Sequence, residues 1–303
     1  MISHPVKIAF VTDRGYLRPT LVAMWSLLER LSRPGEVHFW GEGLSETEWE
    51  AVARVCAIRP DCRLVTRSLD TAELGNFHWE STYITAATMG RLFLPRHVAG
   101  RILYLDGDTI IRGDVAPLFD LDLGDALIGA VRDEPTAKQM VKRKRGRKLR
   151  PAAAERIEAI AAFTDPACYF NAGVLLLDSD RIRATPGLLD QLEDVNAAST
   201  FTMWDQDHLN VIFANRTHFL NPAWNASWAR AGKQRDLSQA LGAEADELAP
   251  LPDTVIQFHG PSKPWFAPRR DLWNRAARAT LSYRQQLRRF LRAFPDLVLP
   301  KKG

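Results

Sequence analysis

Strand-like and helical patterns alternate along this chain of 303 residues, and that alternation limits the folds open to it. Residues 6–12, 37–40 and 62–68 have the pattern of strands, and residues 19–31 and 45–57 between them have the pattern of helices. Ser45 and Glu48 form a capping box at the start of the second helix. Strands separated by helices at this spacing predict an α/β fold with a mostly parallel sheet and right-handed crossovers.

A fourth strand, at residues 102–105, runs directly into the sequence Asp106-Gly107-Asp108. Side chains at i and i+2 of an extended chain point the same way, so both carboxylates can face one point if the strand geometry persists through the glycine. Two like charges that close resist ionisation unless a cation lies near them. Mg²⁺ and Mn²⁺ are hard ions that take such oxygen ligands. The alternative is a solvated Asp-Gly turn of a hairpin.

Polar residues also stand at the ends of other predicted strands. Asp13 and Tyr16 follow the first strand, where the ligands of a βαβ unit lie. Asp133 follows a strand at residues 126–131, and Asn171 and Gly173 stand at the head of a strand at residues 169–178. Ordinary turn chemistry also accounts for Asp13 and Tyr16, and a β-bulge for Gly173.

Three further groups complete the set of candidate site residues. Arg91 lies in a helical pattern at residues 83–94, shortly before the acidic strand. Asp205 and Gln206 open a helical pattern at residues 204–213, where they either bind a ligand or cap the helix. Lys263 lies in a Gly-Pro-Ser-Lys-Pro-Trp loop after a strand at residues 254–259, and a lysine held in so rigid a loop suits a phosphate or a carboxylate.

In this order, these motifs resemble the retaining glycosyltransferases of family 8 over about residues 6–265. That family includes bacterial lipopolysaccharide galactosyl- and glucosyltransferases. The resemblance implies a GT-A fold, in which helices flank a Rossmann-like, mixed and mostly parallel sheet. It also implies Mn²⁺ or Mg²⁺ as cofactor, a UDP-sugar donor (UDP-glucose or UDP-galactose), and a glycan or glycolipid acceptor.

The resemblance also assigns roles to residues by their positions in the motifs. Asp106 and Asp108 are the implied metal ligands, and Asp205 and Gln206 are the implied catalytic residues. The residues implied to bind the nucleotide sugar are Asp13, Tyr16, Arg91, Asp106, Gly107, Asp133, Asn171, Gly260 and Lys263.

One position departs from the family pattern. The third metal ligand of the family is typically a histidine three residues before the glycine of the Gly-Pro-x-Lys-Pro-Trp loop, and Gln257 stands there. Either Gln257 supplies an oxygen, or His259, which lies on the same face of an extended strand, replaces it. A weakened metal site is a third reading. It would make the chain a non-catalytic nucleotide-sugar-binding or glycan-binding protein.

The cysteines and the apolar runs indicate the compartment in which the protein is expected. Cys56, Cys62 and Cys168 are odd in number and have no CxxC spacing, which argues against a disulfide framework or a zinc site and for a reducing compartment. The first residues do not have the pattern of a signal peptide, and no apolar run approaches the length of a spanning helix. A cytoplasmic location is therefore expected.

Two segments concentrate positive charge. Residues 138–150 contain eight Lys or Arg and no acid, which indicates either a solvated surface or one that meets an anionic acceptor or phosphates. Residues 1–266 are predicted to form the GT-A domain and residues 267–303 a basic, amphipathic helical tail. The apolar face of that helix consists of Leu287, Phe290, Leu291 and Phe294, and another face carries Arg284, Arg288 and Arg292. The helix is predicted to lie on the anionic inner face of the cell membrane or, alternatively, to pack on the domain. Nucleic acid is not an expected partner, because no recognition fold accompanies the charge.

Overall fold

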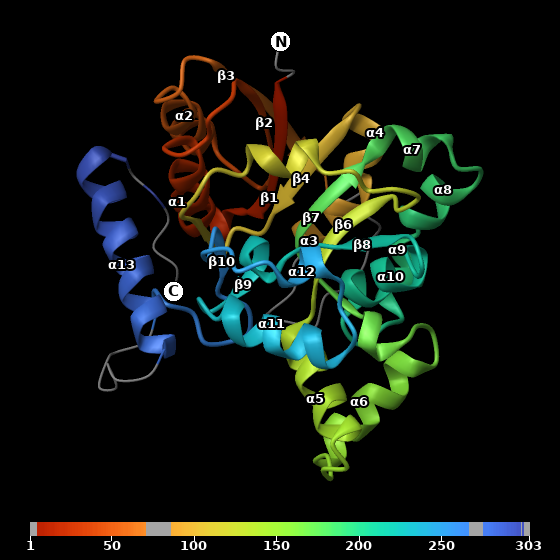
Figure 1. Cartoon of the computed structure of the whole chain (residues 1–303). Helices are drawn as coiled ribbons and strands as arrows, with labels where there is room; N and C mark the ends of the chain where they lie inside the picture. Colours follow the sequence, from red (N-terminus) through yellow and green to blue (C-terminus); the bar gives the residue numbers. More distant parts are fainter. Residues whose placement is uncertain (1–4, 71–85, 267–274, 298, 300–303) are drawn as a thin grey trace.

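The computed structural model describes residues 5–70, 86–266, 275–297 and 299. Its centre is a seven-stranded sheet in the order β3-β2-β1-β4-β7-β6-β8 (Figure 1). These strands are β1 (Val6–Asp13), β2 (Gly35–Glu42), β3 (Cys62–Leu69), β4 (Arg101–Leu105), β6 (Ile128–Arg132), β7 (Phe170–Asp178) and β8 (Thr217–Phe219). The helices are α1 (Leu17–Leu28), α2 (Glu46–Cys56), α3 (Ala86–Met89), α4 (Leu94–His97), α5 (Glu134–Lys144), α6 (Pro151–Ala161), α7 (Ser179–Ala184), α8 (Leu188–Leu192), α9 (Val195–Ser199), α10 (Trp204–Ile212), α11 (Ala231–Ala240), α12 (Ala245–Leu248) and α13 (Arg275–Ala293).

The sheet is mixed and mostly parallel, as the sequence predicts. β1, β2, β3 and β4 run parallel, β7 is antiparallel to both β4 and β6, and β8 is parallel to β6. From β1 the chain adds β2 and β3 on one side and β4 on the other, so the strand order reverses between β1 and β4. Ligands of open α/β sheets bind beyond the carboxyl ends of the strands at such a reversal.

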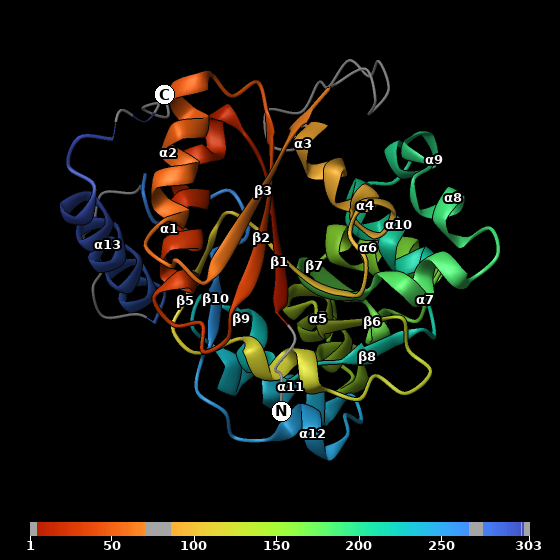
Figure 2. The ribbon, with the colours of Figure 1, turned by 90° about the horizontal axis from the view of Figure 1, so that it is seen from above.

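Helices cover both faces of the sheet (Figure 2). Alternate side chains of a strand point to opposite faces, and β1 follows this rule. Ile8 and Phe10 belong to the core that α1, α2 and α13 cover, whereas Ala9 and Val11 belong to the core that α4, α7 and α10 cover. The apolar run of β1 is therefore buried on both sides, which is typical of a central strand in an α/β protein.

A second sheet of three strands brings distant parts of the chain to the acidic turn. It has the order β5-β10-β9, formed by β5 (Thr109–Ile111), β10 (Val255–Gln257) and β9 (Ala226–Ser227). β10 is antiparallel to β5 and places Gln257 opposite Thr109. Gln257 therefore comes beside the residues that directly precede β5.

Most predicted elements are present, and several differ in extent, among them three near the candidate site. The strand predicted at residues 254–259 ends at Gln257. The helical pattern at residues 83–94 is divided into α3, a 3₁₀ turn at Gly90–Phe93 and α4, with residues 83–85 outside the described part of the chain. β6 begins two residues later than predicted.

α13 packs on the domain through its predicted apolar face. Phe290 is 0% and Phe294 7% exposed, and the rings of Phe290 and Trp25 of α1 lie 5.9 Å apart. Arg289 also forms an ion pair with Glu29 at 2.7 Å. Of the two alternatives for this face, packing on the domain is therefore the one that holds for the two phenylalanines, since an amphipathic pattern alone does not reveal which apolar surface covers it. Of the four apolar residues on that face, Leu291 is exposed.

The predicted division at residues 266/267 stays a prediction, since residues 267–274 lie outside the described residues. Among the helices of the described chain, none has the length and apolar character needed to cross a membrane.

Candidate functional site

The two carboxylates of the acidic turn converge on one point. Gln257 Nε2 lies 2.8 Å from Asp106 Oδ2 and 3.3 Å from Asp108 Oδ1. β4 ends at Leu105, so the turn itself, and not a continuing strand, brings them together. At Gly107 a Cβ atom would lie 2.2 Å from Thr20 Oγ1, so glycine is needed for the turn to approach α1.

Positive and hydroxyl groups surround this pair. Lys263 Nζ lies 2.6 Å from Asp108 Oδ2, and Arg91 lies 3.1 Å from Asp106 Oδ1. The Tyr104 hydroxyl donates a hydrogen bond of 2.6 Å to Asp106 Oδ1. Burial raises the pKa of Asp106, against the influence of Arg91, and the neighbouring Asp108 raises it further.

The donor set at this point fits a hard divalent cation. Gln257 is 3% exposed, and its Oε1 has no hydrogen-bond partner among the described residues. A half-turn of the amide would exchange Nε2 for this orphaned oxygen and set three oxygen donors side by side. Gly173 makes room for the amide, because a Cβ there would meet Gln257 Nε2 at 2.0 Å. Asp106, Asp108 and Gln257 therefore suit Mg²⁺ or Mn²⁺.

His259 is not part of this cluster. Its Nε2 lies 2.6 Å from Ser227 Oγ, and the described residues hold no group of three or more His, Cys, Asp or Glu side chains able to bind a metal. The same-face relation between Gln257 and His259 required an extended strand, but β10 ends at Gln257. Of the two candidate third ligands, the structure brings Gln257 to the carboxylates.

Arg91 links the acidic turn to α10. It lies 3.1 Å from Asp205 Oδ2 as well as 3.1 Å from Asp106, and it donates hydrogen bonds to the carbonyls of Ala172 (2.7 Å) and Thr88 (3.1 Å). Burial raises the pKa of Asp205 to about 6, although Arg91 opposes this change. No described residue donates a hydrogen bond to Asp205 Oδ2, so this oxygen can accept one from a ligand.

Both ends of the Gln206 amide are held. Its Oε1 accepts from the backbone N–H of Ala172 (3.1 Å), and its Nε2 donates to the Tyr169 hydroxyl (3.1 Å). Tyr169 in turn donates to Asp207 Oδ1 (2.5 Å) and accepts from Arg156 (2.9 Å). Because the single phenolic proton goes to the Asp207 carboxylate, Tyr169 can only accept from Gln206, and this fixes which way the amide points.

Asp133 and Asn171 lie together at the same edge of the sheet. Asp133 caps the start of α5 by accepting from the N–H of Thr136 (3.0 Å), and its other oxygen lies 3.4 Å from Asn171 Nδ2. Asn171 Oδ1 accepts from the N–H of Gly173 (2.9 Å) and from Asn225 Nδ2 (2.9 Å). The carboxyl end of β6 and the amino end of the antiparallel β7 meet here.

Asp13 and Tyr16 reach the site through Lys263. Asp13 Oδ1 accepts from the N–H of Tyr16 (2.7 Å), and the Tyr16 ring lies 5.6 Å from the Trp265 ring. Lys263 Nζ lies 5.8 Å from the centre of the Tyr16 ring. Gly260 has a φ of 87°, a left-handed conformation that suits glycine, at the turn that begins this loop.

Tyr104, Tyr169, Asp207 and Arg156 were not predicted as site residues. The position of Tyr104, two residues before Asp106, could have identified it as a neighbour of that carboxylate, since side chains two apart on a strand share a face. No local pattern signals the contacts of Tyr169, Asp207 and Arg156, because they depend on how α6 and α10 pack against β7.

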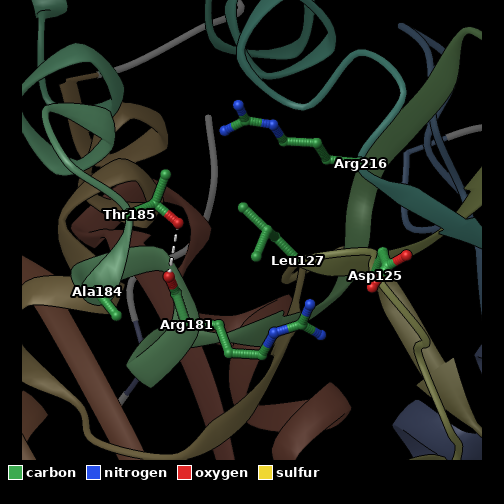
Figure 3. A pocket seen from close by; sticks show the side chains of 6 residues that line it. All are labelled: Asp125, Leu127, Arg181, Ala184, Thr185 and Arg216. Atoms are coloured by element: carbon green, nitrogen blue, oxygen red, sulfur yellow. Dashed lines mark hydrogen bonds between the residues drawn. The ribbon is translucent and has the colours of Figure 1, made fainter.

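None of these groups lines the surface pocket of about 420 Å³ that Figure 3 shows. It is found where β6 begins, whereas Asp133 follows the end of β6. Arg181 on its wall is held by the carbonyls of Gly124 and Ala126, each at 2.8 Å. The lining residues are Asp125, Leu127, Arg181, Ala184, Thr185 and Arg216.

Known proteins resemble this chain in sequence. The family described as glycosyl transferase family 8 matches residues 7–268. General stress protein A of Bacillus subtilis is 26% identical over 193 residues, which cover 61% of this chain and 61% of that protein. The lipopolysaccharide 1,3-galactosyltransferase of Salmonella typhimurium is 26% identical over 168 residues, which cover 54% of this chain and 44% of that protein. The chain thus spans less than two thirds of the length of these relatives.

Solved structures share the fold. The galactosyltransferase LgtC, in complex with donor and acceptor sugar analogues, has a TM-score of 0.69 at 23% identity, with 94% of this chain and 96% of that chain covered. The glycosyltransferase GlyE of Streptococcus pneumoniae has a TM-score of 0.58 at 22% identity, with 99% and 66% covered. The mixed sheet with its flanking helices is therefore the GT-A fold. Because the family match extends over most of the sequence, the chain belongs to glycosyl transferase family 8.

Proposed function

We propose that this enzyme is a metal-dependent retaining glycosyltransferase that moves a hexose from UDP-glucose or UDP-galactose to a glycan acceptor, such as lipopolysaccharide or another cell-surface glycan. Family membership supports sugar transfer from a donor to an acceptor. The observation that carries the proposal is the convergence of Asp106 and Asp108 on Gln257, with Lys263 beside them. Oxygen ligands next to a buried lysine suit a divalent cation and a diphosphate.

The chain's own charges favour departure of the nucleoside diphosphate. Departure places negative charge on the terminal phosphate, and the barrier falls by whatever stabilises that charge more in the transition state than before it. Lys263, once it leaves its ion pair with Asp108, supplies an ammonium group to this phosphate. A cation held by Asp106, Asp108 and Gln257 would act on the same phosphate as a Lewis acid.

Asp205 is suited to orient the donor sugar. Its Oδ2 is buried and accepts no hydrogen bond from a described residue, so a sugar hydroxyl that donates to it adds a bond to an atom otherwise held only by its ion pair with Arg91. Arg91 keeps this carboxylate charged and in place from 3.1 Å. A hydroxyl with the wrong configuration leaves the oxygen without this hydrogen bond, which is how such a site selects one hexose over another.

Retention of configuration requires either a covalent intermediate or attack on the face from which the phosphate departs. The Gln206 amide is a poor nucleophile, and both of its ends are already hydrogen-bonded. We therefore favour same-face attack. The acceptor oxygen bonds to C1 as the bond from C1 to the phosphate oxygen breaks, and the acceptor proton passes to that departing oxygen. A glycosyl adduct trapped on Asp205 or Gln206 and seen by mass spectrometry would contradict this route.

The proposal includes a cytoplasmic location with peripheral contact at the inner face of the cell membrane. The solvent-facing side of α13 supports this contact. Leu281 is 46% and Leu291 44% exposed, and exposed cations accompany them at Arg278, Arg288 and Arg292. Each such cation contributes roughly 1 kcal/mol near an anionic membrane.

Hydrolysis of the donor tests the catalytic part of the proposal. UDP-glucose or UDP-galactose should be hydrolysed slowly in the absence of acceptor, only with Mn²⁺ or Mg²⁺ present. Removal of one preorganised charged group costs on the order of a hundred- to thousandfold in rate, so Asp108→Asn should lose at least that much. Hydrolysis that persists without metal and in Asp108→Asn would reject the proposed centre.

A further inference from the structure

The hairpin of α5 and α6 carries a concentration of unpaired positive charge, and it projects from the body of the molecule (Figure 1). Of the eight cations at residues 138–150, Lys144 donates to the carbonyl of Ala240 (2.7 Å). Lys138 acts electrostatically on Glu134, and in the described part of the chain no carboxylate pairs with the other six, which are Lys142, Arg143, Arg145, Arg147, Lys148 and Arg150. All of these except Lys142 are exposed.

An ordered turn displays these cations. The N–H of Arg147 donates to Lys142 O (3.0 Å), and the N–H of Gly146 donates to Arg143 O (2.9 Å). The two bonds form a Schellman motif, whose left-handed residue is Gly146 with a φ of 67°. α6 then begins with Pro151 at its first position, a placement that helices favour. The charge therefore projects from a folded turn.

The fold alone does not account for the charge. Cations in the last turn of α5 interact favourably with the helix dipole, which explains the three residues from Lys142 to Lys144. Arg147, Lys148 and Arg150 lie beyond that helix, and Arg150 occupies the N-cap of α6, where the dipole disfavours positive charge. Like charges without counter-ions repel one another and destabilise the folded state. An external anion would relieve this repulsion.

The start of α5 and the middle of α6 are anchored at the candidate site. Asp133, at the start of α5, contacts Asn171, and Arg156 of α6 pairs with Asp207 (3.0 Å) and contacts the Tyr169 hydroxyl that holds Gln206. With 11 residues, α5 is about 16 Å long. A molecule that occupies the site and extends along the hairpin therefore reaches the cations.

We propose that the hairpin tip binds an anionic part of the acceptor, namely phosphate or carboxylate groups several sugar units from the hydroxyl that receives the hexose. This inference rests on the proposed function. Guanidinium groups match phosphates and carboxylates through paired hydrogen bonds. Lipid is a poorer match, because the hairpin exposes no large apolar side chain, whereas α13 exposes Leu281 and Leu291. Nucleic acid is also a poorer match, since residues 138–150 contain no aromatic side chain on which a base could stack.

Two variants with equal changes in net charge test the proposal. The hairpin variant combines Arg145→Gln, Arg147→Gln and Lys148→Gln. The control variant combines Arg278→Gln, Arg288→Gln and Arg292→Gln on the exposed side of α13. Fluorescence anisotropy measures binding of a labelled, heparin-derived sulfated hexasaccharide, with labelled maltohexaose as the neutral probe. Sedimentation with phosphatidylcholine vesicles, with and without phosphatidylglycerol, measures binding to lipid.

The hairpin variant should lose affinity for the sulfated hexasaccharide on the order of a hundredfold at low salt, since each cation contributes roughly a fivefold factor. The control variant should lose less than threefold, and maltohexaose should bind none of the three proteins. Equal losses in both variants, or a hairpin variant that loses vesicle binding but keeps the hexasaccharide, would overturn the proposal. The thermal shift caused by UDP-sugars should be the same in the hairpin variant and the wild type. If donors shift none of these proteins, the proposed function fails while the hairpin result still stands.

Discussion

Replacement of Tyr169 by phenylalanine tests whether its hydroxyl positions Gln206 for the reaction or only stabilises the fold. Tyr169 is 1% exposed, and its hydroxyl makes hydrogen bonds to Asp207, Arg156 and Gln206. The Asp207 carboxylate keeps its bonds from Arg156 and from the N–H of Met203 (2.9 Å), so it is not left unpaired. Loss of two bonds to charged groups, Asp207 and Arg156, and of one neutral bond, to Gln206, should lower the free energy of unfolding by at least about 2 kcal/mol.

The effect on the reaction should exceed the effect on donor binding. Without Tyr169, Nε2 of Gln206 loses its hydrogen-bond partner, and the amide can rotate. Misplacement of a group at the reacting centre by about 1 Å costs up to a hundredfold in rate, so we expect kcat for donor hydrolysis to fall roughly ten- to a hundredfold in Tyr169→Phe. The dissociation constant of the donor, measured by calorimetry, should change less than threefold. Ser26→Ala removes another buried hydroxyl, which bonds to the carbonyl of Ala23 and the N–H of Ile111, and serves as the control. A Tyr169→Phe enzyme that is less stable but keeps its wild-type kcat would refute the reasoning.

Three further predictions follow from burial and close contact. Gly173→Ala should abolish the metal-dependent thermal shift by UDP-sugars, because its Cβ would meet Gln257 Nε2 at 2.0 Å; a normal shift would contradict the assignment of Gln257. Burial raises the pKa of Asp205 from 3.8 to about 6, so the folded state binds more protons than the unfolded state in that interval, and wild-type stability falls as pH rises through it. Asp205→Asn should therefore gain melting temperature relative to the wild type between about pH 4 and about pH 7, and a constant difference would argue against a raised pKa. Phe290→Ala should lower the free energy of unfolding by ~3–5 kcal/mol in urea titrations, whereas Leu291→Ala, 44% exposed, should cost about 0.5 kcal/mol or less; equal costs would mean that α13 does not pack as described.

The sequence predicts those parts of the fold and the site that depend on local pattern. Strand and helix periodicity places β1 to β4 and their order along the chain, and the acidic turn after β4 indicates where the crevice lies. Asp106, Asp108 and Gln257 meet because β10 pairs with β5, a pairing that no local pattern reports. The resemblance to the family, through the order of its motifs, is what associates Gln257 with the two aspartates.

The failures of prediction are of one kind. His259 was considered as a ligand because a strand was assumed to continue, and β10 ends two residues before it. Phe290 and Phe294 could not be assigned to lipid or to the domain, because an amphipathic helix carries the same pattern whether lipid or protein covers it. Tyr169 was missed because its partners come from α6 and α10. Each of these depends on contacts between elements far apart in the sequence.

Binding of a donor panel with and without metal tests the central claim most directly. Melting temperatures are measured with UDP-glucose, UDP-galactose and other nucleoside diphosphate sugars, each with Mn²⁺ or with EDTA. A ligand at a hundred times its dissociation constant adds about 2.7 kcal/mol, which is readily detected. We expect a stabilisation that requires Mn²⁺, is lost in Asp108→Asn and is kept in Asp122→Asn, an exposed carboxylate outside the site. A donor shift that is indifferent to metal and to Asp108→Asn would contradict the account.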